Sequence, residues 1–211
     1  MSSILVRRAN MVAGGVTPRL PAGYTELAYL EGTGTQYIDT GIECTSDLKV
    51  QFEGLATTNV NAAASGGIHA TSPYFRHHWS PYNSQFYWIQ KDTASTSSVA
   101  LSASVNTWYN VTIDPTNGTA LINGTEKTFT ALASSYTTGK SYCVFARMAN
   151  NGSTQSRPSK FKFFKMWRGG LLLRDLVPAM RDSDSVVGMY DLVSNTFLTN
   201  AGSGTFNYGT L

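Results

Sequence analysis

The sequence predicts an all-β protein in which two antiparallel sheets pack as a jelly-roll sandwich, and three observations support this. Apolar and polar residues alternate along several short segments, which is the period of a strand with one buried face. Turn-forming sequences separate these segments at close intervals. No stretch of about ten residues or more has the 3.6-residue period of a helix. Two sheets are expected because a single sheet of this size would leave an apolar face uncovered.

The chain is expected to begin with an N-terminal arm, residues 1–20, followed by one sandwich domain, residues 21–211. The arm contains Gly14, Gly15 and Pro18 and shows no sustained periodicity. Short apolar and basic segments of this kind suit docking onto the sheet or groove of a partner, and the alternative is that the arm folds back on its own sandwich. The residues expected to anchor the arm are Ile4, Leu5, Val6, Arg7 and Arg8.

The middle of the chain is expected to form short strands joined by tight turns. Residues 48–53 alternate between apolar and polar and predict a half-buried strand. Residues 108–130 predict a three-stranded meander. Its second turn, Asn123-Gly124, suits the positive φ angles of a primed hairpin turn.

The later part of the chain predicts further strands. Residues 142–148 carry apolar side chains at every second position and are expected to form one strand. Residues 161–167 and 171–177 are expected to pair as a hairpin that ends at Pro178. Phe161 and Phe163 are expected to face the protein core, and the lysines of this strand are expected to face solvent.

Composition narrows the class of protein. Hydrophobic residues make up 42% of the 211 residues and charged residues 14%, which argues against intrinsic disorder. The formal net charge of +3 does not by itself indicate a nucleic-acid partner. No apolar run approaches the roughly 18 residues of a membrane span. The first residues do not have the charged-then-apolar order of a secretory signal peptide.

The spacing of Cys44 and Cys143 matches no metal-binding or redox motif. A disulfide between them is left open.

Three blocks carry a resemblance to a known family. They are residues 28–42, which include Gln36-Tyr37-Ile38-Asp39-Thr40-Gly41, the hairpin 108–124, and residues 161–206, which include Leu173-Arg174-Asp175-Leu176-Val177-Pro178 and Gly188-Met189-Tyr190-Asp191. Over residues 24–208 the chain resembles concanavalin A-like lectin and glucanase domains of the LamG type, in a subgroup found in bacteriophage tail and other virion proteins. The resemblance implies a jelly roll, a scaffold that carries lectins, adhesion modules, hydrolases and structural domains.

No catalytic machinery is expected. Hydrolases on this scaffold commonly carry paired carboxylates as Glu-x-Asp-x-x-Glu, and the chain lacks this pattern. Asp114, Asp184 and Asp191 lie beside turns, where carboxylates bind backbone N–H groups. Adjacent His77 and His78 are expected to point to opposite faces of a strand and not to one metal ion. We therefore expect no enzymatic activity, no cofactor and no metal.

Residues 74–88 are the densest mixture of aromatic and polar residues in the chain. Sugar recognition uses flat aromatic faces for C–H surfaces and polar side chains for hydroxyls. Alternatively, several of these aromatics, Phe75 and Phe86 among them, fill the core. The residues predicted to bind carbohydrate are Arg76, His77, His78, Trp79, Tyr82, Asn83 and Trp88.

Residues 157–181 hold seven basic side chains against Asp175 alone. Such a patch suits an anionic polysaccharide or nucleic acid. The alternative is a strand whose solvent-facing side carries lysine, because long basic side chains cover apolar surface and discourage edge pairing.

These observations together predict a non-catalytic bacteriophage virion protein, such as a tail-fibre component, that acts as a carbohydrate-binding or host-surface adhesion module. The alternative is a structural or decoration protein of the virion, and a glycan-cleaving enzyme ranks third. The expected partners are a glycan or host surface and, through the arm, other virion proteins or copies of this chain. Neither nucleic acid nor a membrane is expected. The expected location is the exposed virion surface, after synthesis in the host cytoplasm without a signal peptide.

Overall fold

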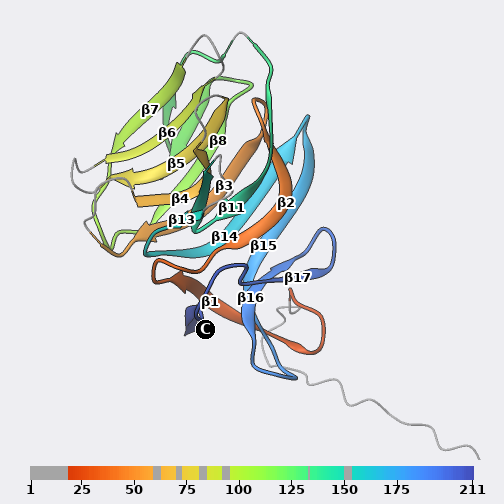
Figure 1. Cartoon of the computed structure of the whole chain (residues 1–211). Helices are drawn as coiled ribbons and strands as arrows, with labels where there is room; N and C mark the ends of the chain where they lie inside the picture. The colour runs from red at the N-terminus through yellow and green to blue at the C-terminus, as the bar shows by residue number, and fades with distance from the viewer. Residues whose placement is uncertain are drawn as a thin grey trace, which may run out of the picture.

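A computed structural model describes residues 19–58, 63–69, 73–80, 85–91, 96–132, 134–149 and 154–211. Within these ranges the regular secondary structure is β-strand without helix, which confirms the all-β prediction (Figure 1). The strands form two sheets, and all but one of their pairings are antiparallel.

The first sheet contains β1 (Tyr24–Gly32), β3 (Lys49–Ala56), β8 (Tyr109–Asp114), β9 (Thr119–Ile122), β10 (Thr125–Thr128), β14 (Ser159–Arg168), β15 (Leu171–Arg181), β16 (Val187–Asp191), β17 (Thr196–Thr199) and β18 (Asn207–Thr210). Its order is β10-β9-β8-β3-β14-β1-β15-β16-β17, and β18 pairs with β1. The hairpin of β14 and β15 opens at one end, where β1 pairs with both strands.

The second sheet contains β2 (Ile38–Thr45), β4 (Ala63–His69), β5 (Tyr74–Ser80), β6 (Gln85–Lys91), β7 (Thr96–Ser102), β11 (Thr137–Val144), β12 (Ala146–Ala149) and β13 (Thr154–Ser156). Its order is β13-β12-β4-β5-β6-β7, while β11 pairs with both β2 and β4. The parallel pairing is the short one between β12 and β4.

The predicted meander is confirmed as β8, β9 and β10. Asn123 and Gly124 have φ angles of 47° and 82° and make the turn between β9 and β10. Both angles are positive, as a type I′ turn requires, so the Asn-Gly sequence accounts for this hairpin.

Two predictions about strand boundaries were wrong. Residues 142–148 are not one strand, because Phe145 has a φ of 72° and the chain turns there between β11 and β12. Pro178 does not end the hairpin, since β15 continues through it to Arg181. Proline is tolerated at this point because the pairing of β15 with β14 stops at Leu176 and that with β1 begins at Ala179, so Pro178 lies in the gap between the two ladders.

The prediction that Phe163 faces the core was also wrong. The pairing of β14 with β3 shifts register between Phe161 and Phe163, as at a β-bulge. Phe161 is buried, but beyond the shift Phe164 and Met166 are buried instead, and Phe163 is half-exposed. An irregularity of one residue exchanges the two faces of a strand, so alternation alone could not find it.

Aromatic side chains from both sheets meet in the core, which makes the fold sandwich-like. Phe52 of the first sheet stacks on His77 of the second, with ring centroids 4.6 Å apart. Phe164 of the first sheet lies 5.4 Å from Tyr142 of the second. All four side chains are fully buried.

A glycine allows two of these rings to meet. Gly66 on β4 pairs with His77 on one side and with Val144 on the other. The Tyr142 hydroxyl and the His77 Nδ1 atom are 2.5 Å apart, in the space that a Cβ on Gly66 would fill. Burial raises the pKa of Tyr142 well above its ordinary value, so its hydroxyl stays protonated in this hydrogen bond with the imidazole.

Two of the sequence blocks that carry the resemblance contact each other. The Arg174 guanidinium donates to the Thr40 carbonyl at 3.0 Å and pairs with Asp191 at 3.3 Å. Asp191 is fully buried and accepts hydrogen bonds from the backbone N–H groups of Asp175 and Val193. The expectation that this carboxylate binds backbone beside a turn is confirmed.

The predicted arm ends earlier than expected. Leu20 is buried with Val177, Ala179 and Tyr190 in a second small apolar cluster. Arg19 pairs with Glu26 on β1. Residues 19 and 20 therefore belong to the domain. The predicted anchoring residues Ile4, Leu5, Val6, Arg7 and Arg8 lie outside the described residues.

The contact over Gly66 predicts a strong effect of a single methyl group. Gly66 has no positive φ, so Gly66→Ala adds no backbone strain, but the new Cβ overlaps Tyr142 and His77. We expect a loss of about 1–3 kcal/mol in the free energy of unfolding, as for other overpacked cores. Urea denaturation measures it. An unchanged midpoint would show that the two rings do not pack over this glycine.

Candidate ligand-binding site

The segment predicted to bind sugar forms the hairpin of β5 and β6. His77 pairs with Trp88 and Arg76 with Ile89 in its register. Phe75, His77 and Trp88 are fully buried, whereas Tyr74 and Arg76 are half-exposed. The inner face of the hairpin is therefore part of the core, as the alternative interpretation proposed for Phe75.

The predicted carbohydrate-binding residues consequently fall into different places. His77 and Trp88 have no exposed surface, so the prediction that they contact a sugar is corrected. Arg76 reaches the surface in part. His78 and Trp79 lie on β5, but the structure does not describe their side chains. Tyr82 and Asn83 lie outside the described residues.

Arg76 is close to two other arginines that come from a distant part of the chain. It pairs across the sheet with Gly67 of β4, and the next residue of β4, Ile68, pairs with Met148 of β12. Arg147 precedes Met148 directly. Gly67 has no side chain, so no side chain on β4 separates the positions of Arg76 and Arg147.

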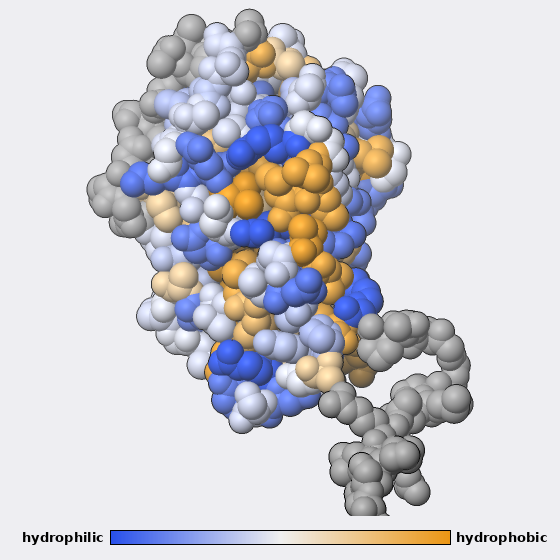
Figure 2. Space-filling model, turned by 90° about the vertical axis from the view of Figure 1, so that its right-hand side faces the viewer, coloured by the Kyte–Doolittle hydropathy of each residue, from blue (hydrophilic) through white to orange (hydrophobic). Residues whose placement is uncertain are grey.

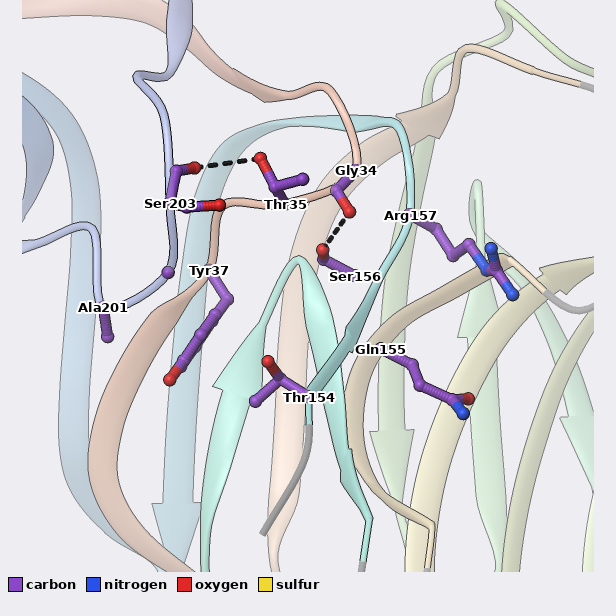
Figure 3. A pocket seen from close by; sticks show the side chains of 10 residues that line it. Gly34, Thr35, Tyr37, Thr154, Gln155, Ser156, Arg157, Ala201 and Ser203 are labelled. Carbon is purple, nitrogen blue, oxygen red and sulfur yellow. Dashed lines mark hydrogen bonds between the residues drawn. The ribbon is translucent and has the colours of Figure 1, made fainter.

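Arg157 joins this group from the end of β13. Arg147 pairs with Gln155 across β12 and β13 and donates to its side-chain oxygen from Nε at 2.8 Å. Arg157 follows two residues later, and Figure 3 shows its side chain extending to the same side as Gln155. The Arg157 N–H also donates to the Phe145 carbonyl at 3.2 Å, which ties β13 to the turn before β12.

The charges of the other two arginines act on Arg147. Burial, together with the positive charges of Arg76 and Arg157, lowers the pKa of Arg147 to about 10. Burial also lowers the pKa of Arg76. The Nε atoms of Arg76 and Arg157 are buried and make no hydrogen bond within the described part of the chain. We call Arg76, Arg147 and Arg157 the arginine cluster.

The cluster differs from every other described arginine. Arg19, Arg168, Arg174 and Arg181 each form an ion pair with a carboxylate. Among the residues that the structure describes, no carboxylate pairs with a member of the cluster. The basic stretch 157–181 is thus mostly neutralised: its lysines and its other arginines all have acidic partners, and Arg157 is the exception.

A pocket of about 490 Å³ adjoins the cluster (Figure 3). It is lined by Gly34, Thr35, Tyr37, Thr154, Gln155, Ser156, Arg157, Ala201, Gly202 and Ser203. Gln155 and Arg157 form the wall that it shares with the arginine cluster. None of these lining residues is acidic, so the pocket offers no pair of carboxylates for glycoside hydrolysis.

Hydrogen bonds to the backbone hold the pocket walls together. The buried Gln36 side chain accepts from the Thr33 N–H and donates to the Thr205 carbonyl, both at 2.9 Å. Thr35 donates to the Ser203 carbonyl at 2.9 Å, and Ser156 donates to the Gly34 carbonyl. Loops from three distant parts of the sequence are thereby fixed around one opening.

Tyr37 supplies the aromatic surface of the pocket. It is half-buried, and Figure 3 shows its ring beside Thr154. Burial, with the nearby Cys143 and Asp39, raises the pKa of Tyr37, although a hydrogen bond with Thr154 acts in the opposite direction. Its hydroxyl is therefore neutral at physiological pH, and it can donate or accept a hydrogen bond.

Sequence reasoning missed most of this site. Tyr37 lies within a quoted block of the resemblance, but nothing in its local pattern marks it as a ligand contact. Arg147 stands alone among apolar residues. Only the fold places Tyr37 in the pocket and Arg147 beside the other arginines.

Cys44 and Cys143 are free and buried, and burial raises the pKa of Cys143 to about 12. The described ranges contain no group of three or more His, Cys, Asp and Glu side chains placed to hold a metal ion. They also contain no helix with the length and hydropathy to span a membrane.

No model of a known protein family matches the chain, and no curated protein matches it either.

Arg174 pairs with Asp191, whereas Arg157 has no acidic partner in the described chain, so loss of the charge should affect stability differently at the two positions. Arg157→Gln removes a charge that repels its neighbours, so we expect the free energy of unfolding to change by less than about 0.5 kcal/mol, or to rise. Arg174→Gln leaves the buried Asp191 unpaired and should cost about 3 kcal/mol. Urea denaturation at neutral pH measures both. Equal losses would mean that Arg157 has a stabilising partner.

Proposed function

We propose that the protein is a non-catalytic carbohydrate-binding or host-surface adhesion module of a bacteriophage virion, on a concanavalin A-like jelly roll. The observation that carries the proposal is the pocket around Tyr37. It combines one half-buried aromatic ring with hydroxyl, amide and guanidinium groups, which is the set of surfaces that a pyranose needs. The all-β, two-sheet architecture supports the choice of scaffold.

The position of this pocket refines the expectation from the sequence. Arg76, one of the residues predicted to bind carbohydrate, belongs to the cluster beside the pocket. The segment containing Trp79 and Tyr82 follows Arg76 along the chain. The proposed ligand surface therefore runs from Tyr37, past Gln155 and Arg157, toward Arg76.

Replacing the pocket aromatic tests the proposal. Tyr37→Ala should weaken binding to any glycan retained by the parent on a glycan array by at least about tenfold, because truncating a central aromatic contact typically costs over 1 kcal/mol. Tyr208→Ala is the matched control, since Tyr208 is an exposed tyrosine that does not line this pocket. Melting temperatures of both variants check that the fold is intact.

Two results would speak against it. A parent protein that retains no glycan contradicts the proposed activity. A Tyr37→Ala variant that binds like the parent moves the site elsewhere. If Trp79→Ala or Tyr82→Ala then abolishes binding, the site is on the segment that the sequence first indicated.

A second candidate function, a structural or decoration protein of the virion, is favoured by an apolar surface. Figure 2, which faces the side where β2, β15 and β17 lie in Figure 1, shows a continuous hydrophobic band. On the elements of this side, Leu171 of β15 is 68% exposed and Val193, between β16 and β17, is 42% exposed. Ile42 of β2 and Leu173 of β15 are half-buried. Apolar surface of this kind marks contacts between proteins when it is contiguous.

The structural candidate predicts that assembly depends on this band or on the arm. Leu171→Glu or deletion of residues 1–18, which leaves Leu20 in place, should abolish self-association in light scattering or incorporation into particles. Glycan binding should persist in both variants. Normal assembly of both would remove the support for this candidate.

A further inference from the structure

We propose that Arg76, Arg147 and Arg157 together bind an oxyanion carried by the ligand, so that the glycan recognised at the pocket is an acidic one. This inference rests on the proposed function and names its substrate class. The chemistry required of the ligand is a carboxylate, sulfate or phosphate group placed next to a sugar ring.

The first argument is the imbalance of charge. Three cationic side chains come from β5, β12 and the residue after β13. Within the described chain none of them has an acidic partner, whereas each other described arginine does. Partly buried like charges repel, and a fold that only needed surface coverage could use neutral side chains here. An anion that enters from solution supplies the missing partner.

The second argument is the unused hydrogen-bonding capacity. The Nε groups of Arg76 and Arg157 are buried donors without an acceptor in the described chain. An unsatisfied buried donor costs free energy that a bound acceptor recovers. Guanidinium groups match oxyanions geometrically, because two parallel N–H groups can reach two oxygens of one anion.

The third argument is how the three side chains are held. Gln155 accepts from Arg147 and keeps its guanidinium beside β13 with a neutral oxygen, so the positive charge is positioned without being cancelled. The aromatic face of Tyr74 lies 5.3 Å from the Arg76 guanidinium carbon and orients that group in the same way. Arg157 links the cluster to the pocket, since it belongs to both.

The anion site has a test that does not depend on knowing the glycan. Full-length protein is melted in sodium phosphate and in sodium chloride at equal ionic strength. Saturating phosphate should raise the melting temperature of the parent by at least about 3 °C more than chloride, because a ligand that binds only the folded state stabilises it. The double variant Arg147→Gln/Arg157→Gln should lose most of that difference.

The matched control is Lys127→Gln/Lys140→Gln, which removes the same net charge from exposed positions. It should keep the full phosphate effect. An equal effect in all three proteins would be the general stabilisation by excluded anions and would overturn the inference. If the cluster variant fails to fold, Arg157→Gln alone is measured, with a partial loss expected and no loss counting against the site.

A glycan array distinguishes a failure of this inference from a failure of the proposed function. It also distinguishes a site for free phosphate from a site for an acidic sugar. Parent, cluster variant and control are compared on sialylated, uronic, sulfated and phosphorylated glycans beside their neutral counterparts. Binding that requires the acidic group of the glycan, and that only the cluster variant loses, supports both proposals. Equal binding of neutral glycans by all three proteins overturns the acidic class but leaves the proposed function intact. A cluster-dependent phosphate effect without any glycan bound supports the anion site and contradicts the glycan function.

Discussion

The hydrogen bond between Tyr142 and His77 across Gly66 is the contact on which the arrangement of the second sheet depends. It joins β11 to β5 over a residue of β4 that has no side chain, directly beneath Phe52 and Phe164 of the other sheet. A shift of β5 by one residue would remove His77 from the core and place Arg76 there. The cost of burying an unpaired guanidinium makes that alternative register far less stable.

The same constraint explains why the arginines meet. With His77 facing inward, Arg76 faces outward beside Gly67, the residue of β4 that lies between Arg76 and β12. The turn at Phe145 then reverses the chain so that Arg147 arrives next to this position. The core therefore fixes an electrostatically unfavourable surface, and such a surface is a common property of binding sites, because ligands supply the compensating charge.

Sequence patterns predicted features that depend on a few neighbouring residues. Alternation predicted β3, and Asn123-Gly124 predicted the turn of the meander, because both are local consequences of backbone geometry. The pocket was beyond such reasoning, since it joins residues near 35, 155 and 203 through long-range hydrogen bonds. The bulge beyond Phe161 and the turn at Phe145 were missed because each depends on packing against another strand and not on its own sequence.

The most direct measurement of the central claim is a titration with sodium phosphate followed through the Arg Nε–H resonances of the full chain in ¹⁵N NMR. Ionic strength is kept constant with chloride throughout. The account predicts that Arg76, Arg147 and Arg157 shift together with one dissociation constant, while Arg174 and Arg181, already paired with Asp191 and Asp184, do not move. Shifts of equal size at all arginines, or none at the cluster, would contradict it.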